Sequence, residues 1–182
     1  MRQHDTSSDS ETKGRRDQAE VGSFYFIFWG IIVSVTNLLQ FILGVLFDYP
    51  YPYVVWLAII PAALFSGVYA IRRRKSHKPT HASSNIHKDN WLFIFSGMLL
   101  IILFGEKVNH QISPLITLLL SIGTFTSGRA MGFRPLQLGG LSLFLASMIM
   151  FLVPRPYQPL IASIGMILGN FVPGLQLRAM TK

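Results

Sequence analysis

The stretch FYFIFWGIIVSVTNLLQFILGVLF, residues 24–47, decides the fold class of this chain. It carries no charged residue over its whole length, and a helix needs about 20 such residues to cross the hydrocarbon core of a bilayer. The run is also longer than the apolar part of a cleavable signal peptide, about 7 to 15 residues, and no small-residue cleavage site follows it. The stretch therefore predicts a membrane-spanning helix.

Five further uncharged runs follow this stretch along the chain, at 53–71, 91–105, 112–128, 136–153 and 160–175. The runs 91–105 and 160–175 are short for a span, so we expect these two helices to extend into their polar flanks or to cross a thin bilayer. The sequence thus predicts an all-α membrane protein, with a six-helix transmembrane bundle over residues 21–182.

The composition of the chain agrees with this prediction. Of 182 residues, 51% are hydrophobic and 13% are charged, whereas a soluble domain carries about 25% charged residues. Cysteine is absent, which excludes disulfides, thiolate metal sites and cysteine nucleophiles. Residues 1–20 hold five acidic and four basic residues and no apolar side chain larger than Ala after Met1, so we predict a flexible, disordered cytoplasmic tail there, with a short helix near the membrane as an open alternative.

The basic residues predict the orientation of the bundle. If the N-terminus is cytoplasmic, six spans leave 14 of the 16 Lys and Arg residues on the cytoplasmic side, and only Lys107 and Arg155 on the other. This is the asymmetry that membrane insertion produces, and it predicts that both termini are cytoplasmic. The outer connections 48–53 and 154–159 are rich in Pro and Tyr, which indicates tight hairpins at the headgroup level.

Small and polar residues form stripes at helical spacing along five of the six runs. The candidate packing and polar face consists of Ser34, Asn37, Gln40, Thr117, Ser121, Thr124, Gly165, Gly169 and Asn170. We interpret these residues as helix contacts, since small residues and amides join helices in lipid. The alternative is a small-solute transporter or channel in which the polar faces of the first and fourth helices line one path. No Asp, Glu, Lys, Arg or His lies within the six runs, and proton-coupled pumps usually need such a residue.

Two prolines fall inside predicted spans. Pro61 removes a backbone hydrogen bond from the second helix, and Pro173 with Gly174 is expected to unwind the last turn of the sixth.

Candidate reactive groups are few. Glu106 and His110 lie four residues apart, which would suit an acid/base pair or half of a metal site if that turn were helical. Hydrated loop charges, with Glu106 paired to Arg155, are the favoured interpretation. His77, His81 and His87 are likewise interpreted as a solvated loop rather than a metal cluster. No catalytic residue, cofactor, metal or nucleic-acid partner is predicted.

The basic run Arg72, Arg73, Arg74 and Lys75 follows the second span directly. It is first of all a stop-transfer signal. It is also a candidate contact for anionic lipid headgroups, which attract basic side chains near the membrane surface.

Four stretches resemble those of small, uncharacterised multi-pass membrane proteins of Bacteroidota: GSFYFIFWG (22–30), FDYPYPYVVW (47–56), SIGTFTSG (121–128) and YQPLIASIGMILGNFVPG (157–174). The resemblance implies a bacterial inner membrane and no assigned activity. With many packing faces and no reactive constellation, the chain is expected to be a structural or regulatory interaction protein that contacts membrane lipids and a partner protein or a second copy. An enzyme acting through Glu106 and His110 at the outer surface is a third hypothesis.

Overall fold

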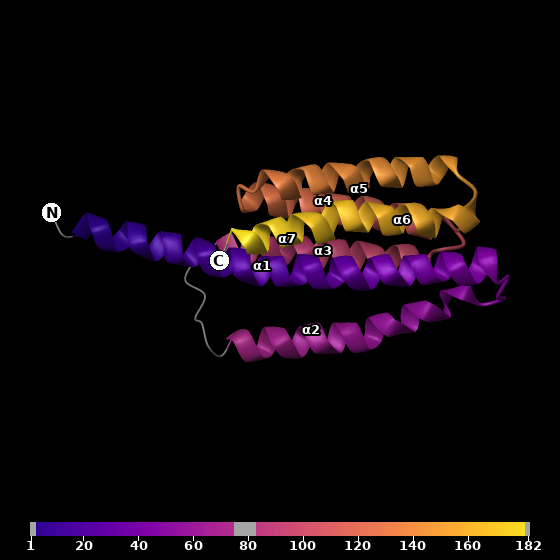
Figure 1. The fold of residues 1–182 in the computed structure, drawn as a ribbon, viewed down its shortest axis with the longest axis horizontal. Coiled ribbons are helices and arrows are strands. Elements are labelled where there is room, and N and C mark those ends of the chain that lie inside the picture. Colours follow the sequence, from indigo (N-terminus) through magenta and orange to yellow (C-terminus); the bar gives the residue numbers. More distant parts are fainter. Residues whose placement is uncertain (1–2, 75–82, 181–182) are drawn as a thin grey trace.

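The described residues form six long helical units that lie roughly parallel or antiparallel to one another (Figure 1). The computed structural model describes the backbone of residues 3–74 and 83–180, and the side chains of 22–72 and 89–180. The first three units are α1 (Gln3–Phe41) with the π-helical turn η1 (Ile42–Leu46), the 3₁₀ turn η2 (Pro52–Ala58) with α2 (Ile59–Arg74), and α3 (Ser83–Leu103). The next two are α4 (Ile112–Ala130) and α5 (Arg134–Leu152).

The last unit is made of four short elements that follow one another without a break. They are η3 (Arg155–Tyr157), α6 (Gln158–Met166), the π-helical turn η4 (Ile167–Phe171) and α7 (Val172–Ala179). We call the run α6–η4–α7 the sixth helix.

The chain is therefore a multi-span, membrane-type helical protein. In the described residues, four helical stretches are long and apolar enough to cross a membrane: Gly22–Leu46, Pro52–Arg72, Arg134–Leu152 and Arg155–Ala179. The apolar part of α3, Asp89–Leu103, is shorter, and the mean hydropathy of α4 is lowered by its Ser, Thr, Gly and Pro residues. All six predicted runs are confirmed as helices in the described residues, whereas the crossing of a membrane by all six stays a prediction.

Two of the expected helix ends are wrong. The sixth helix does not unwind at Pro173 and Gly174 but continues to Ala179. A proline inside an α-helix clashes with the carbonyl four residues earlier, here that of Gly169. The π turn η4, which contains Gly169, ends at Phe171, two residues before Pro173, and accommodates the proline by changing the hydrogen-bond register.

The second correction concerns residues 3–20, which are helical where we predicted a disordered tail. This segment contains Gln, Glu, Lys, Arg and Ala, which favour helix. It also adjoins the apolar part of α1, so the helix extends without a new nucleation step.

The sixth helix and α5 approach each other through glycines. A methyl group on Gly165 would lie 2.9 Å from Cβ of Ala146, and one on Gly139 would collide with the backbone oxygen of Gly169. The α4–α5 pair is equally close, because a methyl group on Gly140 would lie 2.6 Å from the backbone nitrogen of Phe125. Small residues let helices in lipid pack at this distance, so α4, α5 and the sixth helix form a tight group.

The helix α1 packs antiparallel against the other side of the sixth helix. A methyl group on Gly30 would lie 2.9 Å from the backbone nitrogen of Phe171. At the end that holds both termini, a buried cluster joins α1, α5 and α7 through Phe26, Leu136 and Leu177, together with Phe133.

The helix α2 is the outlying element of the bundle (Figure 1). Only 11% of its apolar window is buried, against 50% for the sixth helix. It rests on α1 through a stacked ring pair, Phe24 and Tyr69, and through a hydrogen bond from the Tyr25 hydroxyl to the carbonyl of Ser66. Ala62 and Ser66, two small residues four positions apart on α2, are buried.

Candidate functional site

In the polar stripe of α1, Ser34 and Asn37 are buried and Gln40 is half-buried. The Ser34 hydroxyl donates to the carbonyl of Ser163 at 3.3 Å, and the Ser163 hydroxyl donates to the carbonyl of Ser34 at 2.9 Å. The amide of Asn37 donates to the carbonyl of Val33 at 2.8 Å within α1. Ser34 is thus a contact between helices, whereas the bond of Asn37 stays within α1, so its role between helices stays a prediction.

Gln40, the third residue of that stripe, lies at the opposite end of the bundle from the chain termini. Its side-chain oxygen accepts a hydrogen bond from the indole N–H of Trp56. This bond connects α1 to η2 and holds the start of the α2 unit against the bundle.

The stripe of α4 faces α5 and the sixth helix. Thr117 and Ser121 are buried, and their hydroxyls donate to carbonyls of their own helix, those of Ser113 and Leu118. Thr124 is fully buried, and its hydroxyl donates to the side-chain oxygen of Asn170 at 2.9 Å. Gly165 and Gly169 pack against α5, so the predicted GxxxG motif is a helix contact.

The two polar stripes do not line a common path. The sixth helix lies between α1 and α4, because α1 bonds it at Ser163 and α4 bonds it at Asn170. Among the described residues each stripe thus contacts the sixth helix, whereas the transporter hypothesis needs the two stripes to line one path. In the described residues, every buried side-chain nitrogen and oxygen has a hydrogen-bond partner within the protein.

Several buried polar contacts escaped the sequence reasoning. Ser147 of α5 donates to the carbonyl of Pro114 at 2.8 Å, and the amide of Gln158 donates to the carbonyl of Met150 and to Gln111 at 3.0 Å each. Ser163 could have been found, since it lies seven residues before Asn170 and therefore on nearly the same helical face.

Glu106 and His110 lie in a non-helical turn between α3 and α4. Asn109 and His110 both have positive φ, 53° and 56°, so the helical spacing that would make the pair a site is not present. Arg155 donates to the backbone and side-chain oxygens of Asn109, at 3.0 and 3.3 Å, and not to Glu106. The predicted ion pair is wrong, because the left-handed backbone brings both oxygens of Asn109 to one guanidinium nitrogen. In the described part of the chain no group of three or more His, Asp or Glu residues could hold a metal ion.

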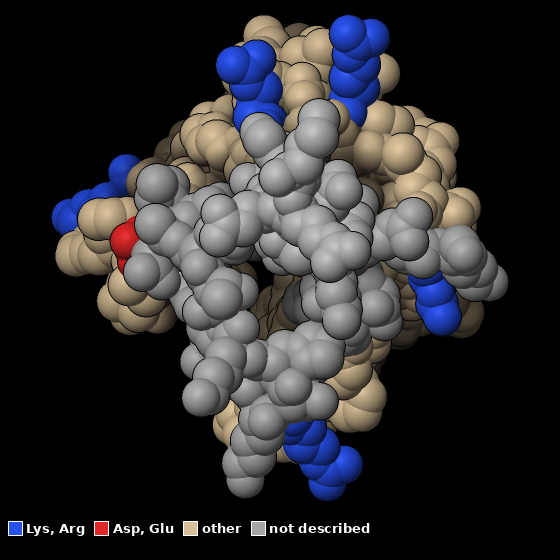
Figure 2. Space-filling model, turned by 90° about the vertical axis from the view of Figure 1, so that its left-hand side faces the viewer, with Lys and Arg blue, Asp and Glu red and all other residues tan. Residues whose placement is uncertain are grey.

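The charged side chains divide between the two ends of the bundle. The end with the chain termini carries Arg72, Asp89, Arg129, Arg134 and Arg178 among the described residues, and basic side chains stand around its rim (Figure 2). The other end carries Asp48, Glu106, Lys107 and Arg155. Arg72 is exposed. The described side chains do not include those of the basic residues Arg73, Arg74 and Lys75. They do not include those of His77, His81 and His87 either.

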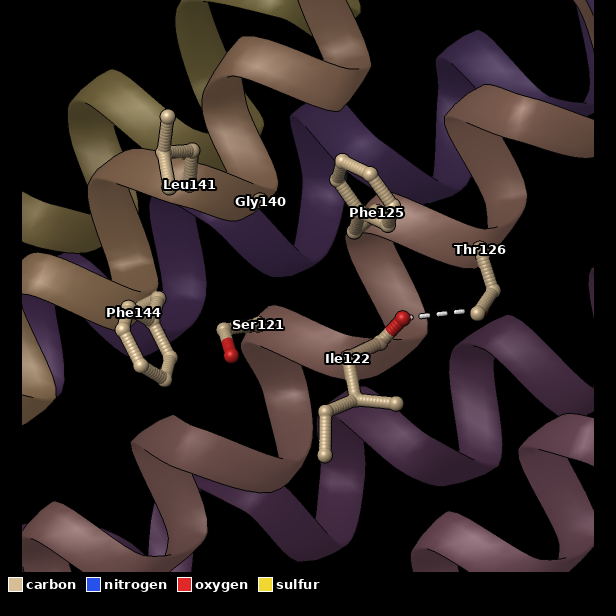
Figure 3. A pocket seen from close by; sticks show the side chains of 7 residues that line it. All are labelled: Ser121, Ile122, Phe125, Thr126, Gly140, Leu141 and Phe144. Atoms are coloured by element: carbon tan, nitrogen blue, oxygen red, sulfur yellow. Dashed lines mark hydrogen bonds between the residues drawn. The ribbon is translucent and has the colours of Figure 1, made fainter.

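A shallow cavity of about 220 Å³ lies on the outer face of α4 and α5 (Figure 3). The large side chains that line it are Phe125, Phe144, Leu141 and Ile122. The Ser121 hydroxyl, which also lies there, donates to a carbonyl of its own helix. A wall of this kind suits a lipid chain and offers no reactive group.

Comparisons with known proteins add no relative. No family model matches the chain, and neither a curated protein nor a solved structure matches it. The resemblance to membrane proteins of Bacteroidota therefore rests on the four sequence stretches alone.

Proposed function

We propose that this protein is a structural or regulatory interaction protein of the bacterial inner membrane, with six spans and both termini in the cytoplasm. It acts by lateral contact of α2 with another membrane helix, from a partner protein or from a second copy of the chain. The observation that carries the proposal is the position of Gly67.

Gly67 is an exposed glycine in the middle of α2. A methyl group added there would meet no atom of the described residues within 4 Å. The other helical glycines whose surroundings the structure describes each face a neighbouring atom within that distance. A helix-interior glycine is about 1 kcal/mol less favourable than alanine, and at Gly67 no contact within the described part of the chain accounts for this cost.

The surroundings of Gly67 suit a second helix. Ala63 precedes it by one turn and is also exposed. Ile60, Leu64 and Ile71 flank these two small residues, with exposed fractions of 59 to 67%. A small residue followed four positions later by glycine, between large aliphatic side chains, is the pattern that lets two backbones approach in a membrane.

The orientation is supported by the division of charge. The described side chains at the terminal end comprise four Arg residues and one Asp, and those at the other end comprise two basic and two acidic residues. The basic end is the cytoplasmic one by the insertion rule. There Arg72 and the adjoining basic residues would contact anionic headgroups.

Replacement of Gly67 tests the lateral contact. The full chain carrying Gly67→Leu is compared in mild detergent with wild type and with Val68→Leu, which adds bulk to the same helix at a neighbouring exposed position. We expect wild type and Val68→Leu to retain a co-purifying partner or a differently tagged second copy, and Gly67→Leu to lose most of it. A monomeric wild-type particle without any retained protein would contradict the proposal, as would full retention by Gly67→Leu.

The absence of cysteine from the chain separates the two kinds of partner. Under mild oxidation, a single Gly67→Cys variant forms a disulfide-linked dimer if a second copy covers α2. Phe93→Cys, at an exposed position of α3, serves as the control for random collision.

A further inference from the structure

A second cavity, of about 280 Å³, lies at the end of the bundle opposite the chain termini. Three segments form it: the end of α1 with η1, the turn that follows, and the start of the last helical unit. Its volume is slightly below the roughly 300 Å³ at which pockets for drug-sized molecules begin. The cavity therefore suits a smaller group, such as a lipid headgroup.

The polar side chains of this cavity are Gln40, Tyr49 and Arg155. The Trp56 indole can only donate a hydrogen bond, so its bond to Gln40 fixes which amide atom is used and leaves the NH₂ group of Gln40 as the remaining donor. In the described residues this NH₂ group has no protein partner. Gln40 therefore offers a donor to a ligand.

Arg155 supplies the charge of the cavity. One of its terminal nitrogens is held by both oxygens of Asn109, while its other N–H groups have no protein acceptor among the described residues. The loop that carries Asn109 is fastened to α6 by the hydrogen bond between Gln158 and Gln111. The guanidinium is thus positioned by the protein, and no acidic side chain of the described residues lines the cavity.

The remaining walls are apolar. Pro52, Pro156 and Pro159 have no backbone N–H, and Gly44 and Val45 belong to the π turn η1. After this turn, Asp48 takes a positive φ of 47°, and the backbone N–H of Tyr49 bonds the carbonyl of Leu43 at 2.9 Å. This reversal brings Tyr49 to the cavity. Both π turns and left-handed residues occur often at functional sites.

We infer that this cavity binds a phosphate group through Arg155, Gln40 and Tyr49. Three donors with one full positive charge and no competing acid select an anionic oxygen acceptor. The position of the cavity favours a phospholipid headgroup as the source, because Tyr and Trp mark the headgroup level and the adjoining Leu46 and Phe47 are 67% and 72% exposed. In the proposed orientation this is the outer leaflet.

Native mass spectrometry of the full chain released from nanodiscs of phosphatidylethanolamine and phosphatidylglycerol tests the inference. We expect wild type to retain phospholipid and Arg155→Ala to retain about tenfold less, the effect of losing one charge-assisted contact. Lys107→Ala is the matched control, since it removes a cation from the same end that does not line the cavity. Equal retention by wild type and Arg155→Ala would overturn the inference.

A second variant guards against a loss caused by disturbed folding. Gln40→Glu leaves the bond between Arg155 and Asn109 in place but adds a negative charge to the cavity, and we expect it also to lose phospholipid by about tenfold. Unchanged retention by Gln40→Glu would overturn the inference. Inorganic phosphate added to wild type separates the sources: failure to displace the lipid supports a headgroup, and displacement at low concentration overturns the lipid source in favour of free phosphate.

Discussion

Ser34 and Ser163 exchange hydrogen bonds across the contact between α1 and the sixth helix, each hydroxyl donating to the backbone carbonyl of the other residue. Both side chains are buried. The pair closes a symmetric contact between two segments that are 129 residues apart in the chain. Because neither hydroxyl is left facing an open path, the stripe to which Ser34 belongs holds helices together.

Removing these hydroxyls should weaken the bundle. We expect Ser34→Ala and Ser163→Ala each to lower the free energy of unfolding by about 0.6 kcal/mol, and by no more than about 1.7 kcal/mol, the range for hydrogen bonds between membrane helices. Reversible unfolding in mixed detergent micelles measures the change. The control is Ser96→Ala, because the Ser96 hydroxyl is exposed and bonds its own helix at Leu92. An equally large decrease in the free energy of unfolding of Ser96→Ala would contradict the stabilising role of the Ser34 and Ser163 hydroxyls.

Thr124 and Asn170 should be coupled in energy. Their side chains bond at 2.9 Å in a fully buried position. In a double-mutant cycle with Thr124→Val and Asn170→Leu, the coupling energy is expected to lie near 0.6 kcal/mol and below about 1.7 kcal/mol. Strict additivity of the two substitutions would mean that the contact contributes nothing to stability.

The close approach of α5 and the sixth helix should not tolerate a methyl group. A side chain at Gly139 would collide with the carbonyl oxygen of Gly169, so Gly139→Ala is expected to lower the free energy of unfolding by about 1 to 3 kcal/mol, as overpacking does. In contrast, Gly67→Ala meets no neighbour and should be neutral, or stabilise a monomer by up to about 1 kcal/mol. Thermal unfolding of the two variants in detergent compares them, and equal stability would contradict the packing.

The helix α2 should open independently of the rest of the bundle. The ring stack of Phe24 and Tyr69, with centroids 4.1 Å apart, is one of the few contacts that hold it. Tyr69→Ala removes about 0.5 to 1.5 kcal/mol of stacking and should speed amide exchange in α2 while leaving α5 unchanged. Phe93→Ala, whose ring is 78% exposed on α3, should alter neither helix. Faster exchange throughout the bundle would show instead that α2 is part of one cooperative core.

The positions of the helices followed from the sequence because lipid imposes a simple condition: an uncharged run of sufficient length must form helix. The extension of the short run 91–105 into its polar flank, where α3 begins at Ser83, followed from the same condition. The π turn before Pro173 did not follow from this condition, since the turn depends on how the Gly169 carbonyl is placed against α5.

The partners of each helix face could not be predicted. The spacing of Ser34, Asn37 and Gln40 showed that they share one side of a helix, but not that this side meets the sixth helix rather than α4. The cavity around Arg155 was missed for a related reason. The sequence places Gln40 on a helix-packing face and Arg155 in a hydrated turn, and only the reversal at Asp48 brings the two regions together.

The central claim is that lipid surrounds a multi-span bundle whose basic end faces the cytoplasm. Labelling of single cysteines in intact cells with a membrane-impermeant thiol reagent tests it most directly, since the chain has no cysteine of its own. The account predicts that Tyr51→Cys and Lys107→Cys react from outside, and that Ala130→Cys at the basic end reacts only after the membrane is opened. Labelling of Ala130→Cys in sealed cells, or recovery of the intact chain as a detergent-free soluble monomer, would contradict it.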